Sequence, residues 1–426
     1  MTRSQNDLSK RDQAVCWHPY TQHGLEEDIL PIVHASGSWL ELADGSRMLD
    51  AISSWWTCLH GHGHPQLVEA LTQQARSLDH VLFAGCTHPG AVDLAEQLTQ
   101  VAPEGLTRVF YSDNGSTAVE VALKAAIQYW IRRGESRRTR FLSLEGAYHG
   151  DTFGAMAAGD PDPFFIDFSP FLFRVERTPP DPQVIEEILK RQPGQFAAVI
   201  LEPLVQGAAG MQMYPPSILS QIRKLCDQHD TLLIADEVMT GFGRTGTLFA
   251  CEQASITPDL LCLAKGLTGG ILPLAATLVR ESIYEAFLST DRSRAFFHGH
   301  SFTANPIGCA VALASLKLLK EEATPDRLDQ IGRQIESGLK DLRGQPGIRD
   351  LRRCGGIVAL ELQDPSGEEG YLSELGPRLR RACLDGEVLL RPLGNVLYAI
   401  PPSSTTPDEC DRIAHALRTV SQTALS

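Results

Sequence analysis

Two short apolar runs, each followed closely by an ionisable residue, constrain the fold of this chain more than any other feature. The runs are LLIA, which precedes Asp236, and LLCLA, which precedes Lys265. Apolar runs of this length between turn residues are typical of buried parallel strands. Because ligands bind beyond the carboxyl ends of the strands in an open α/β sheet, we expect the carboxylate and the amine to face one crevice.

Neither charge is expected at the end of a buried strand without a partner, because an unpaired buried charge is costly in free energy. A pyridoxal phosphate site would account for both residues. The amine of Lys265 would condense with the cofactor aldehyde, and Asp236 would pair with the protonated ring nitrogen. A structural ion pair between the two residues is the simpler alternative, and these residues alone leave it open.

Composition narrows the class of protein. The 426 residues suffice for two or three domains, and 43% hydrophobic with 21% charged residues is typical of a soluble globular protein. The net charge of −14 argues against nucleic-acid binding, and no apolar run is long enough to span a membrane. Ten cysteines are scattered without a C-x-x-C pair, and the N-terminus lacks the apolar core of a signal peptide. We therefore expect a cytoplasmic protein with reduced thiols.

A third feature is a predicted strand, RVFYS, that leads into a helix of about 15 residues. Gly115 and Ser116 lie at the N-terminus of this helix. Free backbone N–H groups and the positive end of the helix dipole can hold a phosphate there. Ordinary capping of the helix by Asn114 or Ser116 is the alternative.

Two further predicted strands bring side chains to the same edge of the sheet. RFLSL leads to Tyr148 and His149, where an aromatic ring could stack on a cofactor, and AAVILEP ends at Glu202. The agreement of these strand ends with Asp236 and Lys265 favours a common site.

The histidines His60, His62 and His64 alternate along the chain and raise the question of a zinc site. Glycines lie between them and Pro65 follows, which disfavours a regular strand that would place them on one face. We therefore favour a loop without a metal.

Nine motifs in order give the chain a family resemblance. They are WHPYTQ, SSWW, YSDNGSTAVEVALK, AYHGDTFGAM, EPLVQGAAGM, ADEVMTGFGRTG, LAKGLTGG, HGHSFTANP and RPLGNVLYAIPP. From about residue 14 to 405 the chain resembles the class-III pyridoxal-phosphate aminotransferases of fold type I. Within this class, WHPYT together with SSWW is similar to the aminotransferases of biotin biosynthesis.

The resemblance implies an α/β fold in which a large domain carries a mostly parallel sheet of seven strands beside a small α+β domain. The expected division is an N-terminal arm with part of the small domain at 1–60, the large cofactor-binding domain at 61–324, and the C-terminal small domain at 325–426. It also implies a homodimer with the active sites at the subunit interface.

The resemblance also assigns roles at the cofactor. Lys265 would bind the cofactor aldehyde, contact the substrate and act as the catalytic base, and Asp236 would contact the ring nitrogen. Gly115 and Ser116 would hold the phosphate. Tyr148 would stack on the ring and line the substrate cleft.

Substrate contacts are implied for Trp55, Gly299 and Arg391, and Tyr20 would tune donor binding and catalysis. From composition alone, Arg391 could equally be a surface arginine. The family commonly has Pro-Thr after the glycine at 299, and that threonine reaches the phosphate of the neighbouring subunit. Here the pair is His300-Ser301, so the serine hydroxyl is the expected substitute for this cofactor contact.

The activity implied by the resemblance is transfer of an amino group from S-adenosylmethionine to 8-amino-7-oxononanoate, giving 7,8-diaminononanoate by a ping-pong mechanism. Lysine as donor, or another ω-aminotransferase acting on ornithine, 4-aminobutyrate or a diamine, are the near alternatives. A non-catalytic cofactor-binding or regulatory protein is disfavoured, because the lysine is intact and no DNA-binding module or basic patch is present.

Overall fold

A mixed sheet of seven strands forms the centre of the computed structural model, which describes all residues except 1–4, 26–28, 365–366, 368–369, 374 and 426. Its strands, in spatial order, are β4 (Leu106–Ser112), β12 (Ala275–Arg280), β11 (Leu260–Leu263), β10 (Leu232–Asp236), β7 (Phe196–Leu201), β5 (Arg140–Leu144) and β6 (Val175–Thr178). All pairings are parallel except the two made by β12. The predicted α/β class and the mostly parallel sheet are therefore confirmed.

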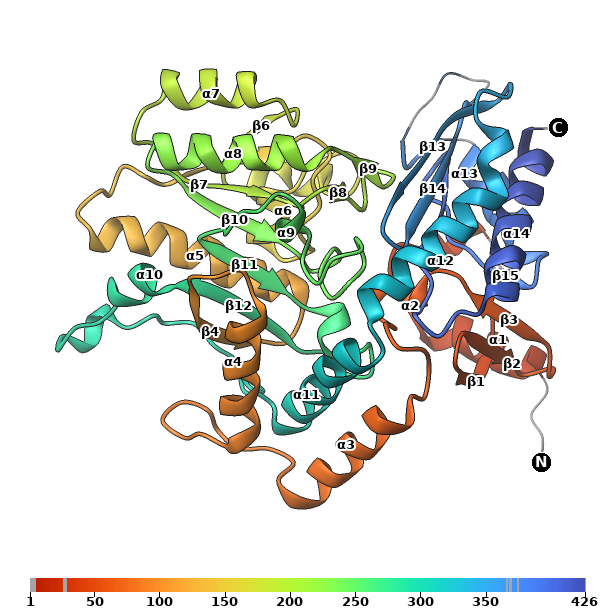
Figure 1. The fold of residues 1–426 in the computed structure, drawn as a ribbon, viewed down its shortest axis with the longest axis horizontal. Coiled ribbons are helices and arrows are strands. Elements are labelled where there is room, and N and C mark those ends of the chain that lie inside the picture. Colours follow the sequence, from red (N-terminus) through yellow and green to blue (C-terminus); the bar gives the residue numbers. More distant parts are fainter. Residues whose placement is uncertain (1–4, 26–28, 365–366, 368–369, 374, 426) are drawn as a thin grey trace.

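Helices cover both faces of this sheet (Figure 1). Successive residues of β7 point to opposite faces, so Ala198 and Ile200 pack in the core under α5 (Gly115–Arg132), whereas Val199 and Leu201 pack in another core. That second core lies under α7 (Pro182–Arg191) and α8 (Pro216–Gln228). Because β7 is buried on both faces, its sequence is a continuous apolar run rather than an alternating one.

Further helices belong to this part of the chain. They are α3 (Pro65–Ser77), α4 (Pro89–Val101), α6 (Phe153–Ala158), α9 (Ala250–Gln253), α10 (Glu281–Glu285) and α11 (Pro306–Glu321). Each of α3, α4 and α11 has a proline in its first turn, where the missing N–H costs no helical hydrogen bond.

The N-terminal strands and the C-terminal elements pack together beside the large sheet (Figure 1). One sheet joins β1 (Ile32–Ser36), β2 (Trp39–Leu42), β3 (Arg47–Asp50) and β15 (Val388–Leu389), and another joins β13 (Ile348–Cys354), β14 (Ile357–Leu362) and β16 (Val396–Ala399). The helices here are α1 (Gln5–Val15), α2 (Ser53–Trp56), α12 (Thr324–Leu339), α13 (Leu375–Leu384) and α14 (Pro407–Leu425). The pairing of β3 with β15 links the first 60 residues to the C-terminal part, and the exact domain boundaries stay a prediction.

A two-stranded ribbon, β8 (Val205–Gln206) with β9 (Gln212–Met213), follows β7. Short 3₁₀ turns occur at His23–Leu25, Ile166–Phe171, Lys265–Thr268, Arg292–Arg294 and Lys340–Leu342. Within the described residues, no helix combines the length and the apolar character that a bilayer crossing requires.

Candidate functional site

The carboxyl ends of β10 and β11 bring Asp236 and Lys265 to one crevice. The two strands are parallel, and Asp236 is in register with Cys262. Lys265 lies two residues beyond the end of β11, at the start of a 3₁₀ turn. The two residues line one cavity of about 600 Å³, which confirms the expected shared crevice.

Segments that are distant in the sequence form the wall of this cavity. They supply Trp56 and Thr57, residues 113–116, Tyr148 to Thr152, Glu202, Asp236, Val238, Met239, Ala264, Lys265, Gly270 and Leu272 to Leu274. The structure therefore brings together five predicted site residues in one chain, namely Gly115, Ser116, Tyr148, Asp236 and Lys265. The sequence did not assign a role to Trp56, although the SSWW motif that contains it was noted.

Asp236 is held by a histidine rather than by the lysine. Its Oδ2 lies 2.7 Å from Nδ1 of His149, and its Oδ1 accepts the Val238 N–H at 3.1 Å. The His149 ring is fully buried, and its Nε2 has no hydrogen-bond partner. The sequence places His149 at this edge of the sheet but does not pair it with Asp236, because 87 residues separate them.

Burial lowers the pKa of the Lys265 amine. Its backbone adopts φ 47°, in the left-handed region, and its Nζ lies 4.6 Å from the centroid of the Trp56 ring. Burial lowers the pKa of Lys265 to about 8, against the opposing effect of Asp236 and Glu202. The direct ion pair between Lys265 and Asp236 that the sequence left open does not form, since Asp236 pairs with His149 instead.

Glu202 is a second buried carboxyl group in the cavity. Its two oxygens accept the Tyr148 N–H at 3.0 Å and the Gly207 N–H at 2.9 Å. Burial raises the pKa of Glu202 to about 7. Glu202 therefore fixes the backbone that presents the Tyr148 ring to the cavity.

The N-terminus of α5 faces the same cavity. Asn114 caps the helix, because its side chain accepts the Thr117 N–H at 3.0 Å and the Thr117 hydroxyl accepts the Asn114 N–H at 3.1 Å. A cap of this kind stabilises a helix by about 1 kcal/mol. It leaves the first-turn N–H groups of Gly115 and Ser116 pointing beyond the helix end. Capping and anion binding are thus compatible here, with Asn114 as the cap.

Residues from three segments fit the groups of pyridoxal phosphate. Lys265 offers an amine of lowered pKa, and Asp236 offers a buried carboxylate that is already oriented by His149. A Cβ on Gly115 would lie only 2.6 Å from Val238 Cγ1, so the phosphate end of the cavity requires glycine at this position. An amine, a carboxylate and a helix N-terminus in one cavity match the aldehyde, the ring nitrogen and the phosphate of this cofactor.

Tyr20 reaches the rim of the cavity from the N-terminal arm. Its hydroxyl donates to Asp151 Oδ1 at 2.6 Å and lies 3.1 Å from the Tyr148 hydroxyl. Tyr148 also donates to Asp151 Oδ1, at 2.9 Å. Burial and the Asp151 carboxylate raise the pKa of Tyr20 well above its usual value, so its hydroxyl stays protonated.

Trp55 and Arg391 lie together in a neighbouring cavity of about 840 Å³, which the N-terminal arm also lines. The Arg391 guanidinium carbon lies 5.0 Å from the centroid of the Trp55 ring. The Tyr20 ring contacts Trp55 with a centroid separation of 5.6 Å. These contacts link the second cavity to the first, and Arg391 is therefore part of a cavity wall rather than an isolated surface residue.

Gly299, His300 and Ser301 do not line the first cavity of their own chain. Their loop is closed by Thr303, whose hydroxyl donates to the His300 carbonyl at 2.8 Å and accepts the His300 N–H at 3.2 Å. The resemblance assigns Ser301 to the phosphate of the neighbouring subunit, so its place outside the cavity of its own chain is consistent with that role, which stays a prediction.

The three alternating histidines have different partners. His60 hydrogen-bonds with Ser315 at 3.1 Å, His62 pairs with Asp50 at 2.9 Å, and His64 lies 3.5 Å from a Glu322 carboxylate oxygen. In the part of the chain that the structure describes, no group of three or more His, Cys, Asp or Glu side chains is arranged to hold a metal ion.

Comparisons with known proteins show which family this chain resembles. The family model for class-III aminotransferases matches residues 20–420. A relative from Synechococcus elongatus named adenosylmethionine-8-amino-7-oxononanoate aminotransferase is 49% identical, over 94% of this chain and 97% of its own length.

Two solved structures extend the similarity to the fold. The crystal structure of adenosylmethionine-8-amino-7-oxononanoate aminotransferase from Methanocaldococcus jannaschii is 36% identical, with a TM-score of 0.94 over 98% of this chain and 99% of that one. An amine transaminase from an uncultivated Pseudomonas species, solved in its PLP-bound form, is 34% identical, with a TM-score of 0.87 over 95% of this chain and 97% of that one.

Proposed function

The chain belongs to the class-III aminotransferases, and we propose that it transfers the amino group of S-adenosylmethionine to 8-amino-7-oxononanoate in biotin biosynthesis. It is a pyridoxal-phosphate-dependent transaminase. The observation that carries the proposal is the single cavity that contains Lys265, Asp236 and the N-terminus of α5. The proposed substrates are those in the names of relatives that match this chain over nearly its full length.

Pyridoxal phosphate, when bound, supplies an aldehyde that takes up an amino group and a ring that accepts the electron pair left by proton removal. Lys265 Nζ would hold the aldehyde and, once displaced by the donor, move the proton between the donor carbon and the cofactor carbon. Its pKa of about 8 allows the amine to be neutral in a useful fraction of molecules near neutral pH. Asp236 would keep the ring nitrogen protonated.

Other residues of this chain would bind and orient. The Gly115 and Ser116 N–H groups would hold the phosphate, with the positive end of α5 behind them. Tyr148 would stack on the ring, since Glu202 fixes its backbone at the cavity wall. Tyr20 would act on the donor from the rim, where it hydrogen-bonds with Asp151.

The second cavity is suited to the acceptor. 8-Amino-7-oxononanoate has a carboxylate at the end of an apolar chain, which Arg391 would bind while Trp55 packs along the chain. The ring of Trp55 faces both Arg391 and Tyr20, so the carboxylate would be held at a distance from the reacting carbon. Gly299 would complete the substrate contacts from a second subunit.

A homodimer would bring Gly299, His300 and Ser301 to a site. Phe297 is 73% exposed and Phe302 is 59% exposed on either side of these residues in one chain. Large exposed aromatic side chains in one loop mark a surface that another protein covers. The Ser301 hydroxyl of one subunit would then reach the cofactor phosphate of the other.

The cytoplasm is the proposed location. All ten cysteines are free thiols, and seven of them are buried. Unpaired cysteines in this number fit a reducing compartment.

The identities of the amino donor and of the acceptor distinguish this function from the near alternatives. Single-turnover absorption spectra of the holoenzyme should show that S-adenosylmethionine converts the cofactor from its aldehyde to its amine form at least about tenfold faster than lysine. The amine form should then be discharged by 8-amino-7-oxononanoate and not by the aldehydes that ω-transamination of ornithine or 4-aminobutyrate forms. A faster conversion with lysine would overturn the donor, and discharge by the other acceptors would favour a different ω-aminotransferase.

A further inference from the structure

The Ser53–Trp56 segment has an unusual backbone conformation, and its two tryptophans line the two cavities of the site. Ser53, Ser54, Trp55 and Trp56 have φ values of 49°, 43°, 69° and 71°. Residues other than glycine rarely adopt this left-handed region, and a run of them persists only where surrounding contacts hold it. Trp56 lines the cofactor cavity and Trp55 lines the neighbouring one.

Asp50, the last residue of β3, holds the start of this segment. Its side chain is fully buried, and one carboxylate oxygen accepts the Ile52 N–H at 3.2 Å. The other oxygen accepts the Ser54 hydroxyl at 2.8 Å. Asp50 therefore folds the chain back on itself directly before the tryptophans.

His62 provides the positive charge that a buried carboxylate requires. Its Nε2 donates to Asp50 Oδ2 at 2.9 Å, and its backbone exchanges two hydrogen bonds with Gly37. Burial lowers the pKa of His62, but the contacts with Asp50 and Cys58 outweigh it and raise the pKa to about 10. His62 is thus charged at neutral pH where it pairs with the Asp50 carboxylate.

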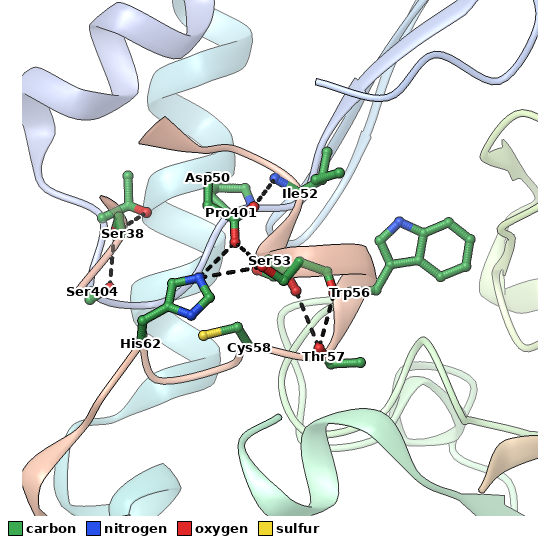
Figure 2. A network of polar contacts seen from close by, with 12 residues as sticks. Ser38, Asp50, Ile52, Ser53, Trp56, Thr57, Cys58, His62, Pro401 and Ser404 are labelled. Atoms are coloured by element: carbon green, nitrogen blue, oxygen red, sulfur yellow. Dashed lines mark hydrogen bonds and ion pairs between the residues drawn. The ribbon is translucent and has the colours of Figure 1, made fainter. Parts of the chain in front are cut away.

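The opposite end of the segment is held by other groups. The Arg244 guanidinium donates to the Trp56 carbonyl at 3.4 Å and to the Cys58 carbonyl at 3.3 Å. The Trp56 indole N–H donates to the Tyr398 hydroxyl at 3.1 Å. In Figure 2 the His62 ring points toward Asp50, whereas the Trp56 ring points away from this pair.

We propose that Asp50 and His62 are positioning residues that hold the left-handed Ser53–Trp56 segment and thereby set how Trp55 and Trp56 face the substrates. Neither residue lines the cofactor cavity or the neighbouring one, so both act through Ile52 and Ser54. The inference rests on the proposed aminotransferase function, because it assigns substrate contacts to the tryptophans.

The test compares His62→Gln with His64→Gln in the full-length holoenzyme. His64 is a matched control: its side chain is 18% exposed, as is that of His62, and it also lies beside a carboxylate, from Glu322. We expect His62→Gln to raise KM for 8-amino-7-oxononanoate about tenfold while kcat changes less than about threefold, because loss of an ionic hydrogen bond loosens a binding wall. His64→Gln should leave both constants near those of the wild type.

Hydrogen exchange provides a readout that does not depend on activity. The amides of Trp56, Thr57 and Cys58 are hydrogen-bonded to carbonyls of Ile52 and Ser53. In His62→Gln the peptide covering residues 53–58 should exchange faster, with the other peptides unchanged. Asp50→Asn should show the same local effect, and if that variant does not fold, His62→Gln alone decides.

Three outcomes would overturn the positioning role. They are faster exchange throughout the protein, equal effects of His62→Gln and His64→Gln, or local loosening without a change in KM. Failure of the proposed function looks different: the wild type would then transfer no amine to 8-amino-7-oxononanoate, while the local exchange difference would still be observed.

Discussion

At the scale of single residues, Lys265 shows how position determines reactivity. A free lysine has a pKa of about 10.4 and is almost entirely protonated at neutral pH. Burial at the end of the sheet disfavours the charged form more than the nearby Asp236 and Glu202 favour it. The amine is consequently a better nucleophile and base than its residue type suggests.

The lowered pKa of Lys265 predicts how the rate of covalent cofactor attachment depends on pH. Only the neutral amine attacks an aldehyde, so the rate at which apoenzyme binds pyridoxal phosphate covalently should rise with pH, with a midpoint near pH 8, and level off at higher pH. Stopped-flow absorbance would measure the rate, and borohydride reduction followed by peptide mapping should recover the label at Lys265. A midpoint near pH 10, or a label at Lys124 or Lys224, would contradict the assignment.

At the scale of elements, the N-terminus of α5 and the segment after β10 are packed too closely for any side chain at Gly115. A Cβ there would lie 2.6 Å from Val238 Cγ1, well inside van der Waals contact. Val238 in turn donates its N–H to Asp236 Oδ1. The phosphate end and the ring end of the cavity are therefore coupled through one valine.

Gly115→Ala should accordingly weaken pyridoxal phosphate binding by more than about tenfold, since overpacking costs about 1–3 kcal/mol. The helical content measured by circular dichroism should not change. Gly90→Ala is the matched control, because Gly90 is also in the first turn of a helix, α4, and its added Cβ would meet no atom closer than 3.6 Å. Equal cofactor affinity in the two variants would show that Gly115 does not shape the binding site.

At the scale of the whole molecule, one chain contains the lysine and the aspartate but keeps Ser301 outside their cavity. A symmetric dimer would provide the serine to each site from the other subunit. The two sites would then depend on each other structurally, and neither would be complete in a monomer.

Mixed dimers test this arrangement. Lys265→Ala should be inactive, and Ser301→Asp should be nearly inactive because it would bring a negative charge toward the phosphate. When the two variants are co-expressed, half of the dimers should be hybrids with one intact site, which gives about a quarter of the wild-type activity. Ser301→Asp expressed alone is the control. Absence of recovery in isolated hybrid dimers would mean that Ser301 does not act across the interface.

Patterns in the amino-acid sequence suffice to predict the local elements and the residues at the strand ends. Buried strands such as β7 and β10 have apolar runs that only a covered sheet accommodates, and α5 begins where a glycine follows Asn114. Asp236, Lys265 and Tyr148 could be found because each lies next to such a run. Their catalytic roles, and the domain boundaries at residues 60 and 324, stay predictions.

Long-range packing brings together groups that the sequence does not pair. The antiparallel place of β12 between β4 and β11, the contact of His149 with Asp236, and the cavity shared by Trp55 and Arg391 all join segments far apart in the chain. The left-handed Ser53–Trp56 segment is the clearest case, because local preference opposes it at a cost of about 1–3 kcal/mol per residue. Contacts from Asp50, His62 and Arg244 outweigh that preference, and no pattern within SSWW encodes them.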